Sequence, residues 1–311
     1  MRVATNSFPN SLLDHLGVLT SRQARLQDQI ATGQRIRRPE DDPAAAARIL
    51  NYQDETRALR QYERNIGNLH DRAQATYTVL RELKKVSDRA GELAVLADDP
   101  DSPEALQAYA VEVTQLIERA VQLANTKWNG EHLFAGTRSD QAPFSITQDL
   151  GGNITGVSYS GNTSIAQSEI AQGVTLSTHT VGENTSGGGP RGLFADSRFG
   201  ADLFNHLISF RDHLLAGDTD AINSTDHQQL ALDEENLLTH LSNNGVIQGR
   251  LEATQNAGAQ RVQALEGEVS KEADVDLAES LVRLNQTQAA YQAALQSGAR
   301  LMSLSLLDYL R

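Results

Sequence analysis

The C-terminal stretch EADVDLAESLVRLNQTQAAYQAALQSGARLMSLSLLDYLR, residues 272–311, carries an apolar helical pattern that its own sequence cannot bury. Mostly apolar residues recur at alternating four- and three-residue steps, the spacing of a coiled-coil seam. An isolated helix is marginal in water, and a leucine contributes roughly 1.5–3 kcal/mol only where something covers it. This segment therefore requires a partner. Its seam positions are Leu277, Leu281, Leu284, Gln288, Tyr291, Leu295, Gly298 and Met302, followed by Leu306 and Tyr309 near the end.

The charge balance narrows the choice of partner, which could be another helix of this chain, another chain or a membrane surface. The chain has a net charge of -13 and a pI of about 5.0. Residues 272–311 carry five acidic side chains against three arginines. Acidic surfaces disfavour both nucleic acid and anionic membranes. A protein partner is therefore expected, with no nucleic acid and no membrane.

Cysteine is absent from the 311 residues, so neither disulfides nor thiolate metal sites contribute to stability. Residues 1–9 lack the apolar core of a secretory signal, and no run of eighteen apolar residues occurs. We expect neither a cleaved signal of this type nor a membrane-spanning helix. A chain that crosses an export channel unfolded would also benefit from lacking cysteine.

The N-terminal region contains a second seam of the same kind, over residues 10–31. Both ends of the chain thus form amphipathic helices with the same repeat, and each can cover part of the other. The sequence therefore predicts that the two terminal helices pair. The N-terminal seam positions are Leu12, Leu16, Leu19, Gln23, Leu26 and Ile30.

A polar connection follows the first helix. Gly33 ends that helix, Arg35, Arg37 and Arg38 follow, and Asp42 with Pro43 opens the next helix as N-cap and first helical residue. A helix over residues 44–97 would be about 80 Å long, far longer than a globular helix, and predicts a rod. Its seam is Leu59, Tyr62, Ile66, Leu69, Ala73, Thr76, Leu80, Leu83, Ser87, Ala90 and Ala94.

The middle of the chain changes character twice. A third helix is expected over residues 103–128, then an apolar anchor over residues 133–136. Residues 143–190 are rich in glycine and in β-branched runs, which indicates short strands. Helices are expected again from residue 199, and a long one from residue 226 into the C-terminal segment.

The predicted fold class is mainly α: an elongated, nested helical bundle or coiled coil formed by the N- and C-terminal regions, with a small β-rich insertion domain. The expected division places residues 1–42 and 267–311 in terminal coiled-coil segments that are flexible in the monomer. Residues 43–136 and 195–266 form the long-helix rod, and residues 137–194 form the insertion.

No catalytic or cofactor pattern appears. Zinc-protease, nucleophile-elbow and phosphate-loop motifs are absent. His206 and His213 lie two helical turns apart, about 10 Å along the axis, too far for one ion, so a solvated surface pair is expected and no metal. Asp41 and Asp42 are explained by helix capping rather than acid–base chemistry. Pairing of the arginines with Glu40 and other nearby acids is favoured over an anion site.

Residues 26–49, LQDQIATGQRIRRPEDDPAAAARI, closely resemble the N-terminal signature of the bacterial flagellin superfamily. Residues 274–281 and 284–294 resemble its C-terminal signature. The ending SLSLLDYLR, residues 303–311, and the anchor LFAGT, residues 133–137, resemble the hook-associated junction proteins of this superfamily more than flagellin. The matched positions of the signature loop are Gly33, Arg35, Ile36, Asp41, Asp42 and Pro43.

This resemblance implies a secreted, extracellular structural subunit of the flagellum that is not an enzyme and connects the hook side to the flagellin filament. Its implied partners are a neighbouring hook-associated protein, flagellin, copies of itself in a ring, and an export chaperone on the C-terminal helix. The terminal seams would supply the axial interface, through Leu12, Leu16, Leu19, Leu26, Ile30, Leu277, Leu281, Leu284, Tyr291, Leu295, Met302, Leu306 and Tyr309.

Two other functions remain open. The same termini would suit a flagellin-type filament subunit, which self-polymerises into long filaments. An acidic coiled-coil adaptor for a soluble partner would instead keep both termini helical as a monomer.

Overall fold

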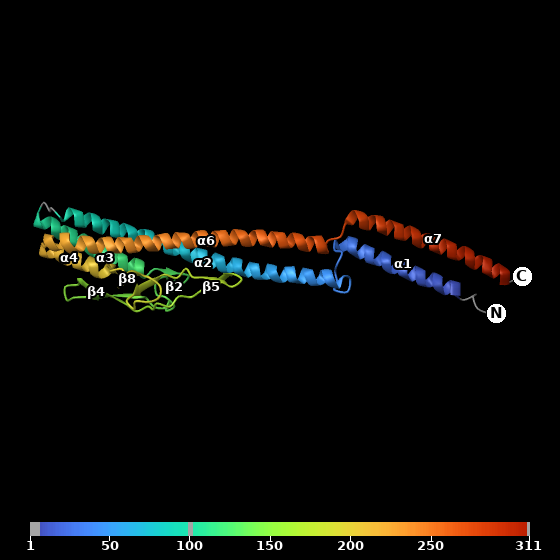
Figure 1. Cartoon of the computed structure of the whole chain (residues 1–311), viewed down its shortest axis with the longest axis horizontal. Helices are drawn as coiled ribbons and strands as arrows, with labels where there is room; N and C mark the ends of the chain where they lie inside the picture. The colour runs from blue at the N-terminus through green and yellow to red at the C-terminus, as the bar shows by residue number, and fades with distance from the viewer. Residues whose placement is uncertain (1–6, 99–101, 310–311) are drawn as a thin grey trace. The chain divides into compact units, whose positions relative to one another are not determined.

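The structure, a computed structural model, describes residues 7–98 and 102–309, with side chains described over residues 10–98 and 102–300. Long helices dominate, and within these residues the strands form four small sheets (Figure 1). The predicted fold class, mainly α with a small β-rich insertion, is confirmed. The helices are α1 (Ser7–Thr32), α2 (Pro43–Leu96), α3 (Pro103–Ala124), α4 (Leu203–Ala216), α5 (Thr219–Ala221), α6 (His227–Ala273) and α7 (Leu277–Tyr309).

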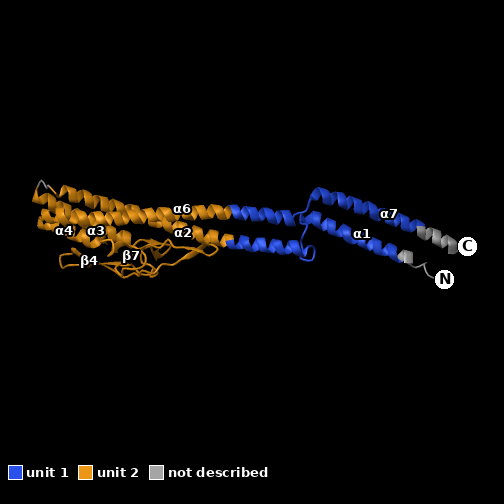
Figure 2. Ribbon diagram, in the orientation of Figure 1, with its two compact units in different colours: residues 1–58, 260–311 blue, residues 59–259 orange. Residues whose placement is uncertain are grey.

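The chain divides into two compact units (Figure 2). Residues 1–58 and 260–311 form the first unit, and residues 59–259 form the second. Both ends of the chain therefore share one unit, as the nested order predicts. Within it α1 and α7 lie side by side (Figure 1), so the predicted pairing of the terminal helices is confirmed.

The second unit is built on the predicted seam of α2. From Ile66 to Ala94 every seam position is buried, including the polar Thr76 and Ser87. Its neighbours α3 and α4 contribute Val113, Ile117 and Leu207 to the same core. The seam, which was predicted from four- and three-residue steps alone, therefore identifies buried positions of this 54-residue helix over residues 66–94.

Short strands surround an aromatic centre. Phe134, from the predicted apolar anchor, is fully buried and meets Phe194 edge to face at 5.5 Å between ring centroids. Phe144 and Phe204 complete the centre. The strands are β1 (Lys127–Trp128), β2 (Glu131–His132), β3 (Phe144–Gln148), β4 (Ile154–Tyr159), β5 (Ser168–Ala171), β6 (Val174–Leu176), β7 (Val181–Asn184), β8 (Gly192–Asp196) and β9 (Ala201–Asp202).

Three of the sheets are antiparallel pairs, β1–β2, β3–β4 and β5–β6. The fourth is β7–β8–β9, with β7 parallel to β8 and β9 antiparallel to it. Asn129 and Gly130 both have positive φ between the paired residues Trp128 and Glu131, so they form the predicted turn as a two-residue hairpin loop.

Three predicted boundaries are wrong. Helix α3 ends at Ala124 rather than at residue 128, because Lys127 and Trp128 pair with the following strand. The helix predicted from residue 199 begins at Leu203, because β8 and β9 occupy residues 192–202. The long C-terminal helix is broken between Ala273 and Leu277, although no proline or glycine stands there. In each case backbone pairing outweighs local helix propensity, with a neighbouring strand at the first two boundaries and with the distant residues 33–35 at the third.

The solvated histidine pair is also a wrong prediction. His206 Nδ1 lies 2.8 Å from Asp233 Oδ2, and that carboxylate is 1% exposed. His213 Nδ1 lies 2.8 Å from Asp226 Oδ2 in the π-helical turn Ile222–Asp226. Both histidines face aspartates that come from the start of α6 and the turn before it. Spacing within α4 could not reveal these partners, which follow it in the sequence.

Stability should depend on the protonation of His206. Burial opposes the charged imidazole, but the hydrogen bond and charge of Asp233 outweigh burial, so the pKa of His206 is raised above 6.5. Burial likewise raises the pKa of Asp233, so the folded pair binds protons more tightly than the unfolded chain. The stabilisation from His206 is therefore complete below pH 6.5 and is lost as the pH rises through the folded-state pKa.

We expect the unfolding free energy of wild type minus that of His206→Gln to decrease as the pH rises above 6.5, measured by urea unfolding. His240→Gln serves as a control of opposite sign. Burial lowers the pKa of His240 to about 4, so wild type should lose stability relative to this variant as the pH falls below 6.5. A His206→Gln difference that does not change with pH would contradict the role of the pair.

Candidate assembly interface

In the first unit, residues 33–42 separate α1 from α2, and residues 274–276 separate α6 from α7. These two segments contact each other and together form what we call the joint. Gly33 has φ +72°, a conformation that glycine adopts without steric cost and that ends α1. The Arg35 N–H donates to the Ala273 carbonyl at 2.6 Å, and the Val275 N–H donates to the Gly33 carbonyl at 2.9 Å. This antiparallel bridge ties the two breaks together and explains why α6 ends before α7 begins.

Side chains strengthen the same joint. Arg35 Nη2 donates to the Glu272 carbonyl at 2.7 Å. Arg48, on the first turns of α2, makes a bidentate contact with the Glu272 carboxylate at 2.9 and 3.0 Å. Paired donors of this kind fix orientation as well as distance. The signature residue Arg35 therefore acts on the C-terminal half of the chain, and Ile36 beside it is buried.

Two aspartates shape the loop itself. Asp42 Oδ1 accepts the Ala45 N–H at 3.0 Å, which confirms its predicted role as N-cap of α2. Asp41 Oδ2 accepts the backbone N–H groups of Arg38 and Arg37 at 3.0 and 3.2 Å. These backbone donors lower the pKa of Asp41, and the Ala45 N–H lowers the pKa of Asp42. Both carboxylates therefore favour the ionised form, but only Asp42 caps a helix: the prediction that capping also explains Asp41 is wrong, because Asp41 binds backbone N–H groups within the loop.

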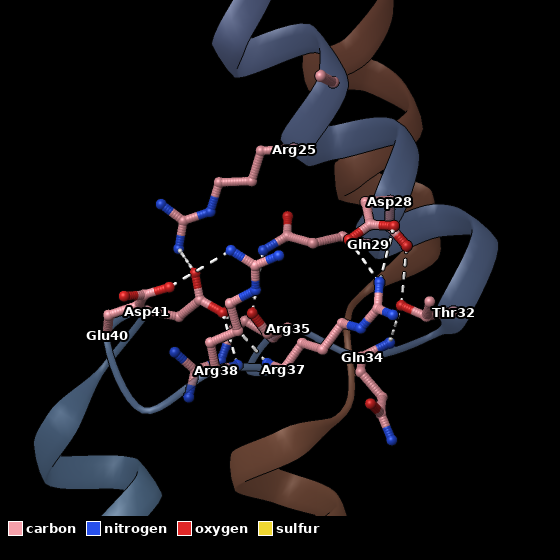
Figure 3. Close-up of a pocket in the computed structure, with 11 residues that line it drawn as sticks. Arg25, Asp28, Gln29, Thr32, Gln34, Arg35, Arg37, Arg38, Glu40 and Asp41 are labelled. Carbon is pink, nitrogen blue, oxygen red and sulfur yellow. Dashed lines mark hydrogen bonds and ion pairs between the residues drawn. The ribbon is translucent and has the colours of Figure 1, made fainter.

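A groove of about 480 Å³ opens beside the joint and is lined by four arginines and three acids (Figure 3). Arg37 Nη1 contacts both oxygens of Asp28 at 3.1 and 3.0 Å. Arg38 pairs with Glu40 at 3.4 Å, and Arg25 with Asp41 at 3.3 Å. Because each of these arginines already meets a carboxylate of the loop or of α1, pairing rather than anion binding describes the groove.

Helix α1 turns its predicted seam toward α7. Leu26 is buried, and the other seam positions from Leu12 to Ile30 are half-buried. On α7, Gly298 is buried, and it lies so close to Leu12 of α1 that a Cβ at this position would overlap Leu12 Cδ2. The less exposed positions of α7 are Ser280, Leu284, Thr287, Gln288, Tyr291, Ala294 and Gly298.

The pair leaves apolar side chains uncovered. Leu277, Leu281 and Leu295, all predicted interface positions, are 49%, 47% and 45% exposed. The face of α7 that packs against α1 is therefore rotated relative to the predicted seam. Ser280 and Ala294 are less exposed than Leu281 and Leu295, the predicted positions that follow them directly. The side chains of Met302, Leu306 and Tyr309 lie outside the described residues. The predicted seam did not include three other exposed apolar residues of this pair, namely Leu13, Val18 and Val282.

Other classes of site have little support in the structure. Over residues 7–98 and 102–309, no group of three or more histidines and acids is placed to hold a metal ion. In the same residues, no helix is both long and apolar enough to cross a membrane. The outward apolar face of α1 and α7, together with the joint, is therefore the candidate site.

Comparison with known proteins identifies flagellar relatives. Residues 3–139 match the model of the bacterial flagellin N-terminal helical region. The chain is 24% identical over 293 residues to flagellar hook-associated protein 3 of Escherichia coli K12, covering 90% of both chains. It is 32% identical over 111 residues to the flagellar filament 30.7 kDa core protein of Treponema maltophilum, covering 35% of this chain and 39% of that one.

Solved structures show the same fold. A flagellar hook-associated protein from Vibrio parahaemolyticus superposes with a TM-score of 0.63 at 17% identity, over 75% of this chain and 100% of that one. The flagellar junction protein FlgL from Legionella pneumophila gives 0.56 at 14% identity, over 73% and 100%. The resemblance to the flagellin superfamily, and within it to hook-associated protein 3, is confirmed.

Proposed function

We propose that this chain, a relative of flagellar hook-associated protein 3, is a structural subunit of the bacterial flagellum that joins the hook side to the flagellin filament. The observation that carries the proposal is the α1–α7 pair, which leaves a row of leucines exposed on the unit that contains both chain ends. Such a surface on a helical pair is suited to contacts with further copies of similar helices. The match to hook-associated protein 3 over 90% of the chain supports the junction role.

In this proposal residues 1–42 and 267–311 are the axial segments, flexible until they meet the growing structure. Residues 43–136 with 195–266 form the rod, and residues 137–194 form the outer insertion. The joint would then fix the direction in which the axial segments leave the rod, because Arg35, Arg48 and Glu272 connect its parts. The axial interface would use the predicted seam residues and also the exposed Leu13, Val18 and Val282.

The proposed partners are a neighbouring hook-associated protein, flagellin and further copies of this chain in a ring. An export chaperone would cover the C-terminal helix before assembly, since that helix carries exposed leucines on its outward face. The protein would work outside the cell as part of the flagellum and would not be an enzyme.

A flagellin-type filament subunit is the second candidate, favoured by the match to the Treponema maltophilum filament core protein. That role would require the protein to polymerise along the whole filament. A soluble acidic coiled-coil adaptor is the third candidate, and it would require stable helices at both ends of the monomer.

Position on the flagellum separates these roles. We expect an antibody to this protein to label isolated hook–filament structures as a single band at the boundary between hook and filament. Labelling along the whole filament would support the filament role and overturn the junction role. Absence of the protein from isolated flagella, with recovery as a soluble complex, would support the adaptor.

A further inference from the structure

The second unit contains one buried arginine whose charge is incompletely matched. Arg72, on α2, is 5% exposed. Its Nη1 donates to Glu131 Oε2 at 3.3 Å, but the Glu131 side chain is 55% exposed. Burying a charge is costly unless a partner of opposite charge is buried with it. A single long contact to a solvated carboxylate only partly meets that requirement.

The other edge of the Arg72 guanidinium has no partner. Its Nε and Nη2 atoms are buried and make no hydrogen bond to any of the described residues. These two atoms form the parallel fork that matches two oxygens of a carboxylate or a phosphate. Two buried donors left unmatched on one charged group require an explanation.

The surrounding segments come from three places in the sequence. Glu131 belongs to β2, while Thr178 and His179 lie in the connection between β6 and β7. Burial, together with the nearby Arg72 charge, lowers the pKa of His179 to about 4, so this imidazole is neutral at pH 7. Thr178 is also buried, and its Oγ1 lacks a partner among the described residues. The surroundings are therefore neutral or positive, apart from Glu131.

We propose that the Nε–Nη2 fork of Arg72 binds a small inorganic oxyanion of the phosphate or sulfate class. The oxyanion would satisfy both donors and balance the buried charge, whereas a water molecule would leave the charge unmatched. It would also connect α2 to the segment carrying Thr178 and His179. This site lies within the second unit and does not depend on the proposed flagellar role.

The test is thermal unfolding of the full chain, freed of oxyanions in a chloride buffer and titrated with inorganic phosphate. We expect Tm to rise and saturate, by about 2–4 °C at ten times the Kd, with no comparable rise at matched chloride ionic strength. Arg72→Lys keeps the charge but lacks the fork, and should weaken phosphate binding at least tenfold. Arg81→Gln, an exposed arginine on the same helix, should leave it unchanged.

Glu131→Gln gives a readout that a purely structural role of Arg72 would not move. Removing the competing carboxylate should tighten phosphate binding, because the remaining charge on Arg72 is then unshared. A wild-type Tm that responds equally to phosphate and to chloride would overturn the proposal. The same holds if Arg72→Lys binds phosphate as tightly as wild type. Phosphate also stabilises folded proteins in general, but that effect does not saturate at low concentration. Saturation of the wild-type Tm therefore decides the question even if a variant fails to fold, and a rise that does not saturate would overturn the proposal.

Discussion

A variant carrying Leu277→Ser, Leu281→Ser and Leu295→Ser should remain folded but fail to enter flagella. These side chains are 45–49% exposed, so each change should alter monomer stability by at most about 0.5 kcal/mol. Covering the exposed half of each leucine in an assembly would contribute roughly 1 kcal/mol, or about 3 kcal/mol for three. That loss corresponds to more than a hundredfold in each association step. The measurement is the amount of protein recovered in isolated flagella.

The control changes three apolar residues in the second unit that are more exposed than these leucines, Val111→Ser, Leu150→Ser and Leu215→Ser. This control should enter flagella at close to the wild-type level. Circular dichroism should show the same helical content in both variants and in wild type. If the first variant is folded and still incorporated normally, the outward leucines are not the axial interface, and the proposed mechanism of assembly is wrong.

Much of the helical fold follows from the sequence because its determinants are local. The seam of α2 repeats for thirty residues, and the N-cap Asp42 with Pro43 marks where that helix begins. The pairing of α1 with α7 follows from two matched seams at opposite ends of the chain. In a pattern of this length, one residue that departs from the repeat does not change the predicted helix face.

Two of the errors arise where the deciding interaction is remote in sequence. The break after Ala273 depends on hydrogen bonds to Gly33 and Arg35, more than two hundred residues away. The burial of His206 depends on Asp233, on a different helix. No periodicity within one segment contains this information.

The candidate site was predictable in part. The signature loop contains arginines and acids that pair with each other or with side chains of α1, and the seam included Leu277, Leu281 and Leu295. The seam predicted the inward positions Leu284, Tyr291 and Gly298, but apolar spacing did not show that Leu277, Leu281 and Leu295 point outward. The close contact of Gly298 with Leu12 of α1 is visible only in the folded pair. Small residues set helix rotation through close packing, which a count of apolar residues does not register.

Gly192→Ala should cause a large loss of stability from the addition of a single methyl group to the second unit. A Cβ at this position would overlap the Ala195 carbonyl oxygen and lie 2.6 Å from the Asn184 nitrogen. Both are backbone atoms in the parallel pair β7–β8, so neither can rotate away. The Gly192 carbonyl also accepts hydrogen bonds from Asn236 at 3.0 Å and His240 at 3.2 Å. Relief of the overlap must therefore disturb the contact between β8 and α6.

We expect a loss of about 3 kcal/mol or more, which for a unit of this size lowers Tm by roughly 6–12 °C. Gly188→Ala is the matched control, since the same methyl group there meets no atom within 4 Å and the backbone φ is not positive. That control should keep the wild-type Tm within about 2 °C. Equal Tm values for the two variants would mean that β8 can move away from β7 without cost. The parallel pair would then contribute little to the fold, and the aromatic centre around Phe194 would have to hold β8 in place by itself.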